Sequence, residues 1–191
     1  MNRRKGQSST SATALLVVDV QEAAVAYGPY RGDMVLENIA TLIAACRAAG
    51  VEVIHVQHDG QPGDDNPPGS KGWEIHAAVR PGPEEKVVRK RFNSAFRETD
   101  LRAYLDERGI DTLILVGIQT EYCVDTTCRV AFEYGFTVVM PEMTNTTYDN
   151  GEITASQIYD HHNQRIFDGR FATVLSMPET LAAIGIGGSF S

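Results

Sequence analysis

The sequence predicts an α/β protein with a three-layer, Rossmann-like fold, in which helices cover both faces of a six-stranded parallel sheet. Short apolar runs of strand length alternate with helical patterns roughly six times along the chain. No internal repeat or domain linker interrupts this alternation, and a length of 191 residues fits one domain. We expect the strand order 3-2-1-4-5-6, which is common in doubly wound sheets.

The six expected strands are short runs rich in Val, Ile and Leu. They are 14–18, 51–56, 87–88, 113–116, 137–140 and 172–175. The helices between them show apolar residues at helical spacing, and glycines follow three of them at their expected ends. We expect helices from the cap Asp33 to Gly50, over 99–109, over 121–134 and over 153–166. The Gly-, Pro- and Asp-rich segment 58–72 is expected to be a loop that forms a pocket wall.

Composition narrows the function classes. The net charge is −8, and no basic run is long enough to follow a phosphate backbone, so we expect no nucleic-acid partner. No apolar run approaches the ~20 residues of a membrane span, so no membrane association is expected. Residues 1–12 have the composition of a disordered N-terminal tail that precedes one domain over 13–191. Three cysteines without a CxxC pair favour a reducing, cytoplasmic location.

The topology places two reactive side chains, a carboxylate and a thiol, near one another. Ligands of such sheets bind beyond the carboxyl ends of the strands, where the strand order reverses. Asp19 ends the first strand, and the fourth strand leads to Cys123. Cys123 falls in the first turn of its helix, where the helix dipole favours a thiolate, and a thiolate is a nucleophile.

Each of these residues also has a plain structural interpretation. Cys123 could be a small core residue, as we expect for Cys46 and Cys128 on the apolar faces of their helices. Asp19 could form a backbone hydrogen bond in a turn. Lys90 taken alone is typical of a solvated surface lysine.

Three segments make the sequence resemble the isochorismatase-like cysteine hydrolases over residues 13–178. They are Val17-Val18-Asp19-Val20-Gln21, Lys90-Arg91-Phe92-Asn93-Ser94-Ala95-Phe96 and Gly117-Ile118-Gln119-Thr120-Glu121-Tyr122-Cys123-Val124. The resemblance implies that 13–191 is one isochorismatase-like hydrolase domain with the catalytic triad Asp19, Lys90 and Cys123. It also implies a cis peptide bond between Ile118 and Gln119, an oxyanion hole from the backbone N–H groups of Gln119 and Cys123, and a homodimer or homotetramer.

Two segments depart from the family pattern. Gln57-His58-Asp59-Gly60 stands where nicotinamidases carry an Asp-x-His metal pair. We therefore expect no metal and no cofactor, although His58, Asp59 and His76 could approach one another. Ala23-Ala24-Val25 replaces an aromatic residue of many relatives, which leaves the pocket shape open. The segment around Cys123 is similar to that of a subgroup that includes streptothricin hydrolase.

The sequence thus predicts a cysteine-dependent hydrolase that cleaves an amide, lactam or carbamoyl C–N bond of a small molecule through a thioester. The alternatives are a vinyl-ether hydrolase of isochorismatase type and a catalytically silent binding protein with the same fold. Six further residues are expected to line the substrate pocket: Gln21, Trp73, Phe92, Phe96, Tyr122 and Tyr148.

Overall fold

A parallel sheet in the order β3-β2-β1-β4-β5-β7 forms the centre of the computed structural model, which describes residues 12–190. The order predicted from the sequence is confirmed, with β7 as the sixth strand along this path. A two-residue strand, β6, pairs with the end of β4 and was not predicted. The strands are β1 (Ala12–Val18), β2 (Glu52–His58), β3 (Lys86–Lys90), β4 (Ile110–Ile118), β5 (Thr137–Pro141), β6 (Asn145–Thr146) and β7 (Thr173–Leu175).

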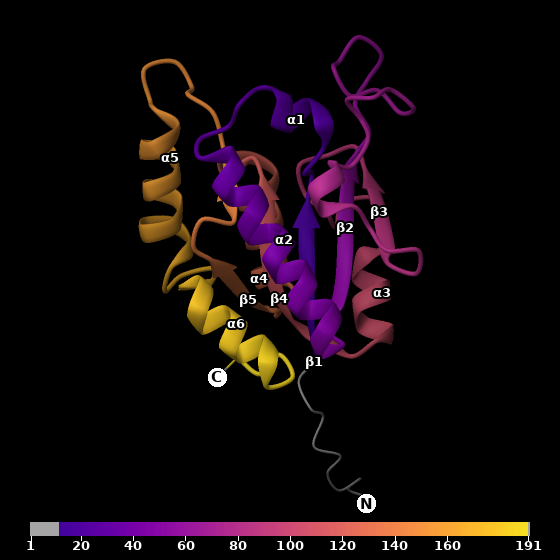
Figure 1. The fold of residues 1–191 in the computed structure, drawn as a ribbon, viewed down its shortest axis with the longest axis vertical. Coiled ribbons are helices and arrows are strands. Elements are labelled where there is room, and N and C mark those ends of the chain that lie inside the picture. The colour runs from indigo at the N-terminus through magenta and orange to yellow at the C-terminus, as the bar shows by residue number, and fades with distance from the viewer. Residues whose placement is uncertain (1–11, 191) are drawn as a thin grey trace, which may run out of the picture.

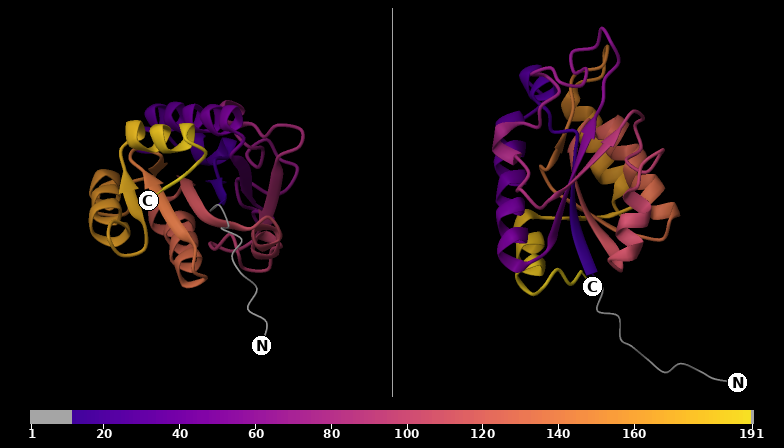
Figure 2. Two further views of the ribbon diagram at one scale, coloured as in Figure 1. Left: turned by 90° about the horizontal axis from the view of Figure 1, so that it is seen from below. Right: turned by 90° about the vertical axis from the view of Figure 1, so that its right-hand side faces the viewer.

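Helices cover both faces of this sheet, as Figures 1 and 2 show. The helix α2 (Gly32–Ala49) packs with α6 (Met177–Gly185) on one face, and α3 (Leu101–Glu107) and α4 (Asp125–Glu133) cover the other. The strand β1 shows why this works. Leu15 and Val17 belong to the core on the α2 side, whereas Leu16 and Val18 belong to the core on the α4 side. Alternate side chains of a strand point to opposite faces, so a strand between two helical layers is apolar throughout.

The helices differ from the expected ones mainly at their ends. α2 begins at Gly32, not at Asp33, because Arg31 in a left-handed conformation takes the cap position. The helix expected over 121–134 starts with a π-helical turn, Thr120–Val124, and the one expected over 153–166 is α5 (Ala155–His161) followed by a π-helical turn, His162–Phe167. Two helices, α1 (Glu22–Ala26) and α6, were not predicted. Cys46 and Cys128 are buried in the two cores, as expected.

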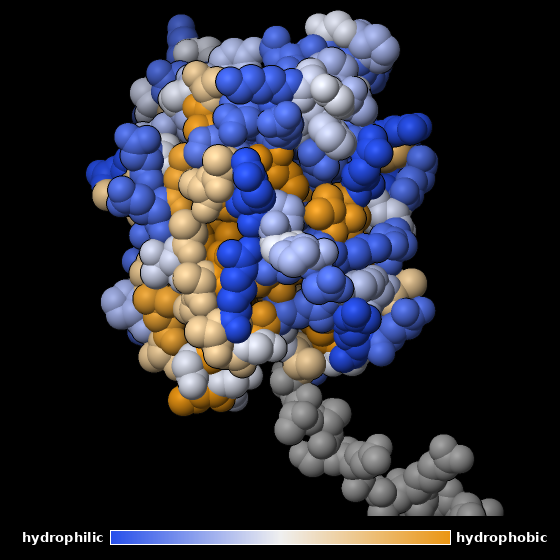
Figure 3. Space-filling view, turned by 45° about the vertical axis from the view of Figure 1, so that its right-hand side comes forward, coloured by the Kyte–Doolittle hydropathy of each residue, from blue (hydrophilic) through white to orange (hydrophobic). Residues whose placement is uncertain are grey.

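The predicted tail over 1–12 falls almost wholly outside the described residues, although Ala12 is already the first residue of β1. Within residues 12–190 no helix has the length and apolarity needed to cross a membrane. The face seen in Figure 3 is largely polar towards its upper end, and a vertical band of apolar residues runs through its lower part.

Gly117, near the end of β4, permits the closest approach between the two central strands. Its φ is +138°, and a Cβ atom at this position would lie 2.0 Å from the carbonyl oxygen of Val18. Val18 immediately precedes Asp19, so the same contact sets the distance between the ends of β1 and β4. Any larger residue would push the two strand ends apart.

We therefore expect Gly117→Ala to lower the free energy of unfolding by about 2–6 kcal/mol, since unfavourable φ and overpacking each cost ~1–3 kcal/mol. Gly185→Ala is the matched control, because it has an ordinary φ and nothing within 4 Å of the added Cβ. Urea unfolding should show the control to be neutral or slightly stabilised. Equal stability of the two variants would contradict the close-approach argument.

Candidate active site

Four neighbouring strand ends bring the candidate residues together. Asp19 directly follows β1, His58 and Lys90 are the last residues of β2 and β3, and β4 ends at Ile118, five residues before Cys123. Because these strands are parallel and adjacent in the order 3-2-1-4, their carboxyl ends meet at one edge of the sheet. The expectation that the topology unites a carboxylate and a thiol agrees with these positions, and Lys90, which the family resemblance added, lies at the same edge.

The Lys90 ammonium lies at the centre of the group. Its Nζ is 2.5 Å from Asp19 Oδ2, 3.3 Å from Cys123 Sγ and 3.2 Å from His58 Nδ1. The Lys90 side chain is 0% exposed, so the surface alternative for this residue is excluded. Burial by itself lowers the pKa of Lys90, whereas the Asp19 charge and the hydrogen bonds to Asp19 and Cys123 raise it, and the net pKa is above its ordinary value. Lys90 therefore carries a positive charge at neutral pH.

Asp19 occupies a turn that only a few residue types tolerate. Its φ is +53°, a left-handed conformation in which short polar side chains such as Asp are enriched. Its N–H donates to Val56 O, and Gln21 N donates to Asp19 O, which together fix the backbone. Its carboxylate is buried, and Oδ1 has no hydrogen-bond partner among residues 12–190. That oxygen is an acceptor available to a group brought into the site.

Burial and the neighbouring charges together act on Cys123 against the thiolate that its position at a helix start predicts. Burial, together with the negative charge of Asp19, raises the pKa of Cys123 to about 12. The Lys90 charge acts in the opposite direction but is the smaller effect. The first turn is also π-helical rather than α-helical, with Val124 N donating to Gln119 O. Deprotonation of Cys123 therefore requires a proton acceptor.

The turn that carries Cys123 is supported from below by buried polar side chains. The peptide bond between Ile118 and Gln119 is cis. Thr120 Oγ1 donates to Asn145 Oδ1 at 2.8 Å, and the Asn145 and Asn163 amides exchange hydrogen bonds at 2.9 and 3.1 Å. All three side chains are at most 3% exposed, so these contacts are shielded from water. The Cys123 turn is thus tied to β6 and to the π-helical turn that follows α5.

A cavity of about 250 Å³ opens directly above Cys123. Asp19 and Cys123 line it, and most of the other lining side chains are polar. They are Gln21, Ala24, His58, Asn66, Asn93, Ile118, Gln119 and Tyr122. A cavity of this size holds a small molecule or the reacting end of a larger one.

Of the six predicted pocket residues, Gln21 and Tyr122 line this cavity. Phe96 does not: it is buried in the core on the α4 side, where it packs against Tyr134 and Phe136. The prediction for Phe96 is wrong because the chain directs Ser94, Ala95 and Phe96 inward after Asn93.

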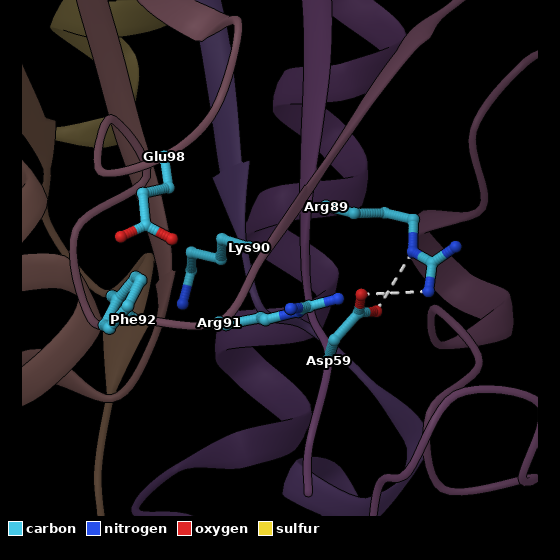
Figure 4. A pocket seen from close by; sticks show the side chains of 6 residues that line it. All are labelled: Asp59, Arg89, Lys90, Arg91, Phe92 and Glu98. Carbon is cyan, nitrogen blue, oxygen red and sulfur yellow. Dashed lines mark hydrogen bonds and ion pairs between the residues drawn. The ribbon is translucent and has the colours of Figure 1, made fainter.

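Phe92, Trp73 and Tyr148 are also placed elsewhere. Phe92 lines a separate cavity of about 340 Å³ with Asp59, Arg89 and Glu98, shown in Figure 4. The remaining two act through hydrogen bonds outside the Cys123 cavity. Trp73 Nε1 donates to Asp59 Oδ1, and the Tyr148 hydroxyl donates to Ala24 O.

The three side chains considered for a metal site have separate partners. His58 contacts Lys90, Asp59 forms an ion pair with Arg89, and His76 Nδ1 accepts a hydrogen bond from Ala78 N. Over the described part of the chain, no three His, Cys, Asp or Glu side chains are grouped so as to hold a metal ion.

Sequence reasoning missed three residues of the site. His58 was considered only for metal binding, although it contacts Lys90. Asn93 lies 3.9 Å from Cys123 Sγ through Oδ1, and its place three residues after Lys90 in the family segment was an available signal. Asn66 comes from the long loop, where no sequence pattern marks it.

Comparison with known proteins agrees with this architecture. The family model described as the Isochorismatase domain matches residues 13–178. The chain is 45% identical to a streptothricin hydrolase of Streptomyces noursei over 71% of its own length and 50% of the relative. It is 30% identical to the ureidoacrylate amidohydrolase RutB of Variovorax paradoxus, over 86% of this chain and 79% of the relative.

The solved structure of an isochorismatase from Pseudomonas putida superposes with a TM-score of 0.83 at 29% identity, covering 93% of this chain and 94% of the other. The chain spans only about half the length of the streptothricin hydrolases that it matches (50% and 55%). The family model and the full-length structural match nevertheless cover the sheet, both helical layers and the Cys123 cavity. This chain belongs to the isochorismatase family.

Proposed function

We propose that this protein is a cysteine-dependent hydrolase that cleaves a C–N bond of a small molecule, with Cys123 as nucleophile. The observation that supports this most directly is the placement of a thiol, a carboxylate and an ammonium within hydrogen-bonding or ion-pair distance at the edge of a cavity. Relatives named as hydrolases and amidohydrolases support the same reaction class.

The proposed first step is proton transfer coupled to attack. Asp19 accepts the proton of the Cys123 thiol while Sγ forms a bond to the carbonyl carbon of the substrate. The electron pair of the carbonyl moves to its oxygen, which the backbone N–H groups of Gln119 and Cys123 stabilise. The nearby Lys90 charge stabilises the negative charge throughout.

The proposed second step releases the amine. The tetrahedral intermediate collapses, the C–N bond breaks, and protonated Asp19 returns its proton to the departing nitrogen. A thioester between Cys123 and the acyl group remains. Asp19 then accepts a proton from water, whose oxygen attacks the thioester, and the thiol is regenerated with release of the acid.

The high pKa of the Cys123 thiol agrees with this order of events. A permanently charged thiolate next to the Asp19 carboxylate would be destabilised by repulsion, whereas a thiol can donate its proton to Asp19 when the substrate arrives. The cavity supports a small polar substrate, since Asn66 and Asn93 offer amide donors and acceptors around Cys123. Amide, lactam and carbamoyl groups match such partners.

We expect Cys123→Ala to reduce hydrolysis to background and Asp19→Asn to reduce it at least about 100-fold, since general-base catalysis contributes about 10²–10⁴. The measurement is release of ammonia or amine across a panel of small amides, lactams and carbamoyl compounds. Cys128→Ala is the control, because that thiol lies in the core. Full activity in Cys123→Ala would exclude the covalent mechanism, and cleavage of a vinyl ether but of no amide would favour the isochorismatase-type reaction.

Asp19→Asn, which should slow hydrolysis, should instead speed the alkylation of Cys123. The Asp19 charge raises the pKa of Cys123, so Asp19→Asn should lower that pKa and increase the thiolate fraction at pH 7.5. Each pKa unit changes the thiolate fraction tenfold in this range, so we expect iodoacetamide to modify Cys123 about tenfold faster or more. Lys90→Met should slow the modification, because the Lys90 charge lowers the pKa.

Intact mass spectrometry with peptide mapping measures these rates. Cys46 and Cys128 are internal references, since burial raises the pKa of each to about 12 and both lie in the cores. Slower alkylation of Cys123 in Asp19→Asn than in the protein without a substitution would show that Asp19 does not act on Cys123 through its charge.

A further inference from the structure

Lys90 reaches Asp19 across an intervening strand. β2 lies between β3 and β1, and neighbouring strands are ~4.8 Å apart, so the backbones of β3 and β1 are roughly 10 Å apart. The Lys90 side chain spans this distance to place Nζ 2.5 Å from Asp19 Oδ2. A long lysine side chain loses rotamer entropy when it is held in one conformation. A contact on the middle strand would hold it there.

His58 occupies that position on the middle strand. It is the register partner of Lys90 in the parallel pair of β2 and β3, and its Nδ1 lies 3.2 Å from Lys90 Nζ. Gln21 holds the His58 backbone on both sides: His58 N donates to Gln21 Oε1 at 2.9 Å, and Gln21 Nε2 donates to His58 O at 3.1 Å. Gln21 therefore fixes the His58 backbone from which the imidazole reaches Lys90.

The donors and acceptors can be assigned without ambiguity. An ammonium has three N–H donors and no acceptor, so Nδ1 of His58 must be the acceptor of the contact. Asp19 Oδ2, Cys123 Sγ and His58 Nδ1 then use all three donors of Lys90. A neutral imidazole that accepts at Nδ1 carries its proton on Nε2. Burial and the Lys90 charge lower the pKa of His58, in agreement with a neutral ring.

We infer that His58 is a positioning residue that holds the third N–H of Lys90, so that the other two point at Asp19 and Cys123. The tautomer leaves Nε2–H as a donor, and His58 lines both the Cys123 cavity and a neighbouring cavity of about 550 Å³. A substrate with an oxygen acceptor beside the scissile bond fits that donor. The catalytic consequence rests on the proposed function, whereas the effect on Lys90 and Cys123 does not.

The test compares two isosteric replacements. His58→Asn retains an acceptor near the Nδ1 position, and His58→Leu has a similar shape without any acceptor. We expect iodoacetamide at pH 7.5 to modify Cys123 in His58→Asn at nearly the same rate as in the protein without a substitution. In His58→Leu we expect the rate to be about tenfold lower. Without an acceptor at residue 58, the Lys90 ammonium is held less firmly beside Cys123, so it stabilises the Cys123 thiolate less. The pH profile of the rate in His58→Leu should move to higher pH accordingly.

The pH profile of the alkylation rate also depends on the other charged groups near the His58 ring. Lys90, Asp19, Asp59 and Asp64 contribute to the His58 environment, and all are unchanged in both variants. His161→Leu is the control, because His161 is exposed at the end of α5. Equal alkylation rates in His58→Asn and His58→Leu would overturn the inference. So would a rate in His58→Leu equal to that of the protein without a substitution.

A folding failure of His58→Leu and a failure of the proposed function can each be recognised separately. If His58→Leu does not fold, His58→Ala replaces it, and added imidazole should restore at least part of the alkylation rate; no restoration would overturn the inference. With an amide that the unmodified protein hydrolyses, His58→Leu should lower kcat more than it changes KM. Hydrolysis of no amide, combined with the expected alkylation order, would refute the proposed function and leave the role of His58 supported.

Discussion

The buried ion pair between Lys90 and Asp19 is the interaction on which the site depends. Taking two charges out of water costs several kcal/mol per ion, and the attraction between them recovers this only when the geometry is good and the remaining hydrogen-bonding groups are satisfied. Lys90 meets this condition with three partners, whereas Asp19 keeps Oδ1 without one. All three N–H donors of Lys90 therefore have acceptors, whereas Asp19 Oδ1 has no hydrogen-bond donor within residues 12–190. An open, buried carboxylate oxygen is suited to receive a proton.

The same pair controls the protonation of Cys123. Burial and the Asp19 carboxylate raise the pKa of Cys123, the Lys90 ammonium lowers it, and the net result favours the thiol. A small displacement of Lys90 or Asp19 would change this balance, since the interaction between charges depends steeply on distance in a poorly solvated site. For this reason the residues that hold Lys90 and Asp19 matter as much as the two residues themselves.

The fold supplies this precision by using strand ends and buried polar contacts rather than free loops. Asp19, His58 and Lys90 lie at or directly after strand ends, and the strands are held by the apolar cores on both faces. The Cys123 turn is held from the opposite side by the buried amides of Asn145 and Asn163. The loop that follows β2 contributes Asn66 to the cavity, whereas Asp19 and Lys90 come from the ends of β1 and β3.

The sequence by itself determined the fold class, the strand order and the identity of Asp19, Lys90 and Cys123 as neighbours. Apolar periodicity decides which segments become strands, and the parallel order then decides which strand ends meet. Only the tertiary structure decided the protonation of Cys123, because burial and the Asp19 charge outweigh the helix start that the sequence displays. It also decided that Phe96 is a core residue and that His58 contacts Lys90, since side-chain direction after a turn and contacts across strands depend on packing and register rather than on local pattern.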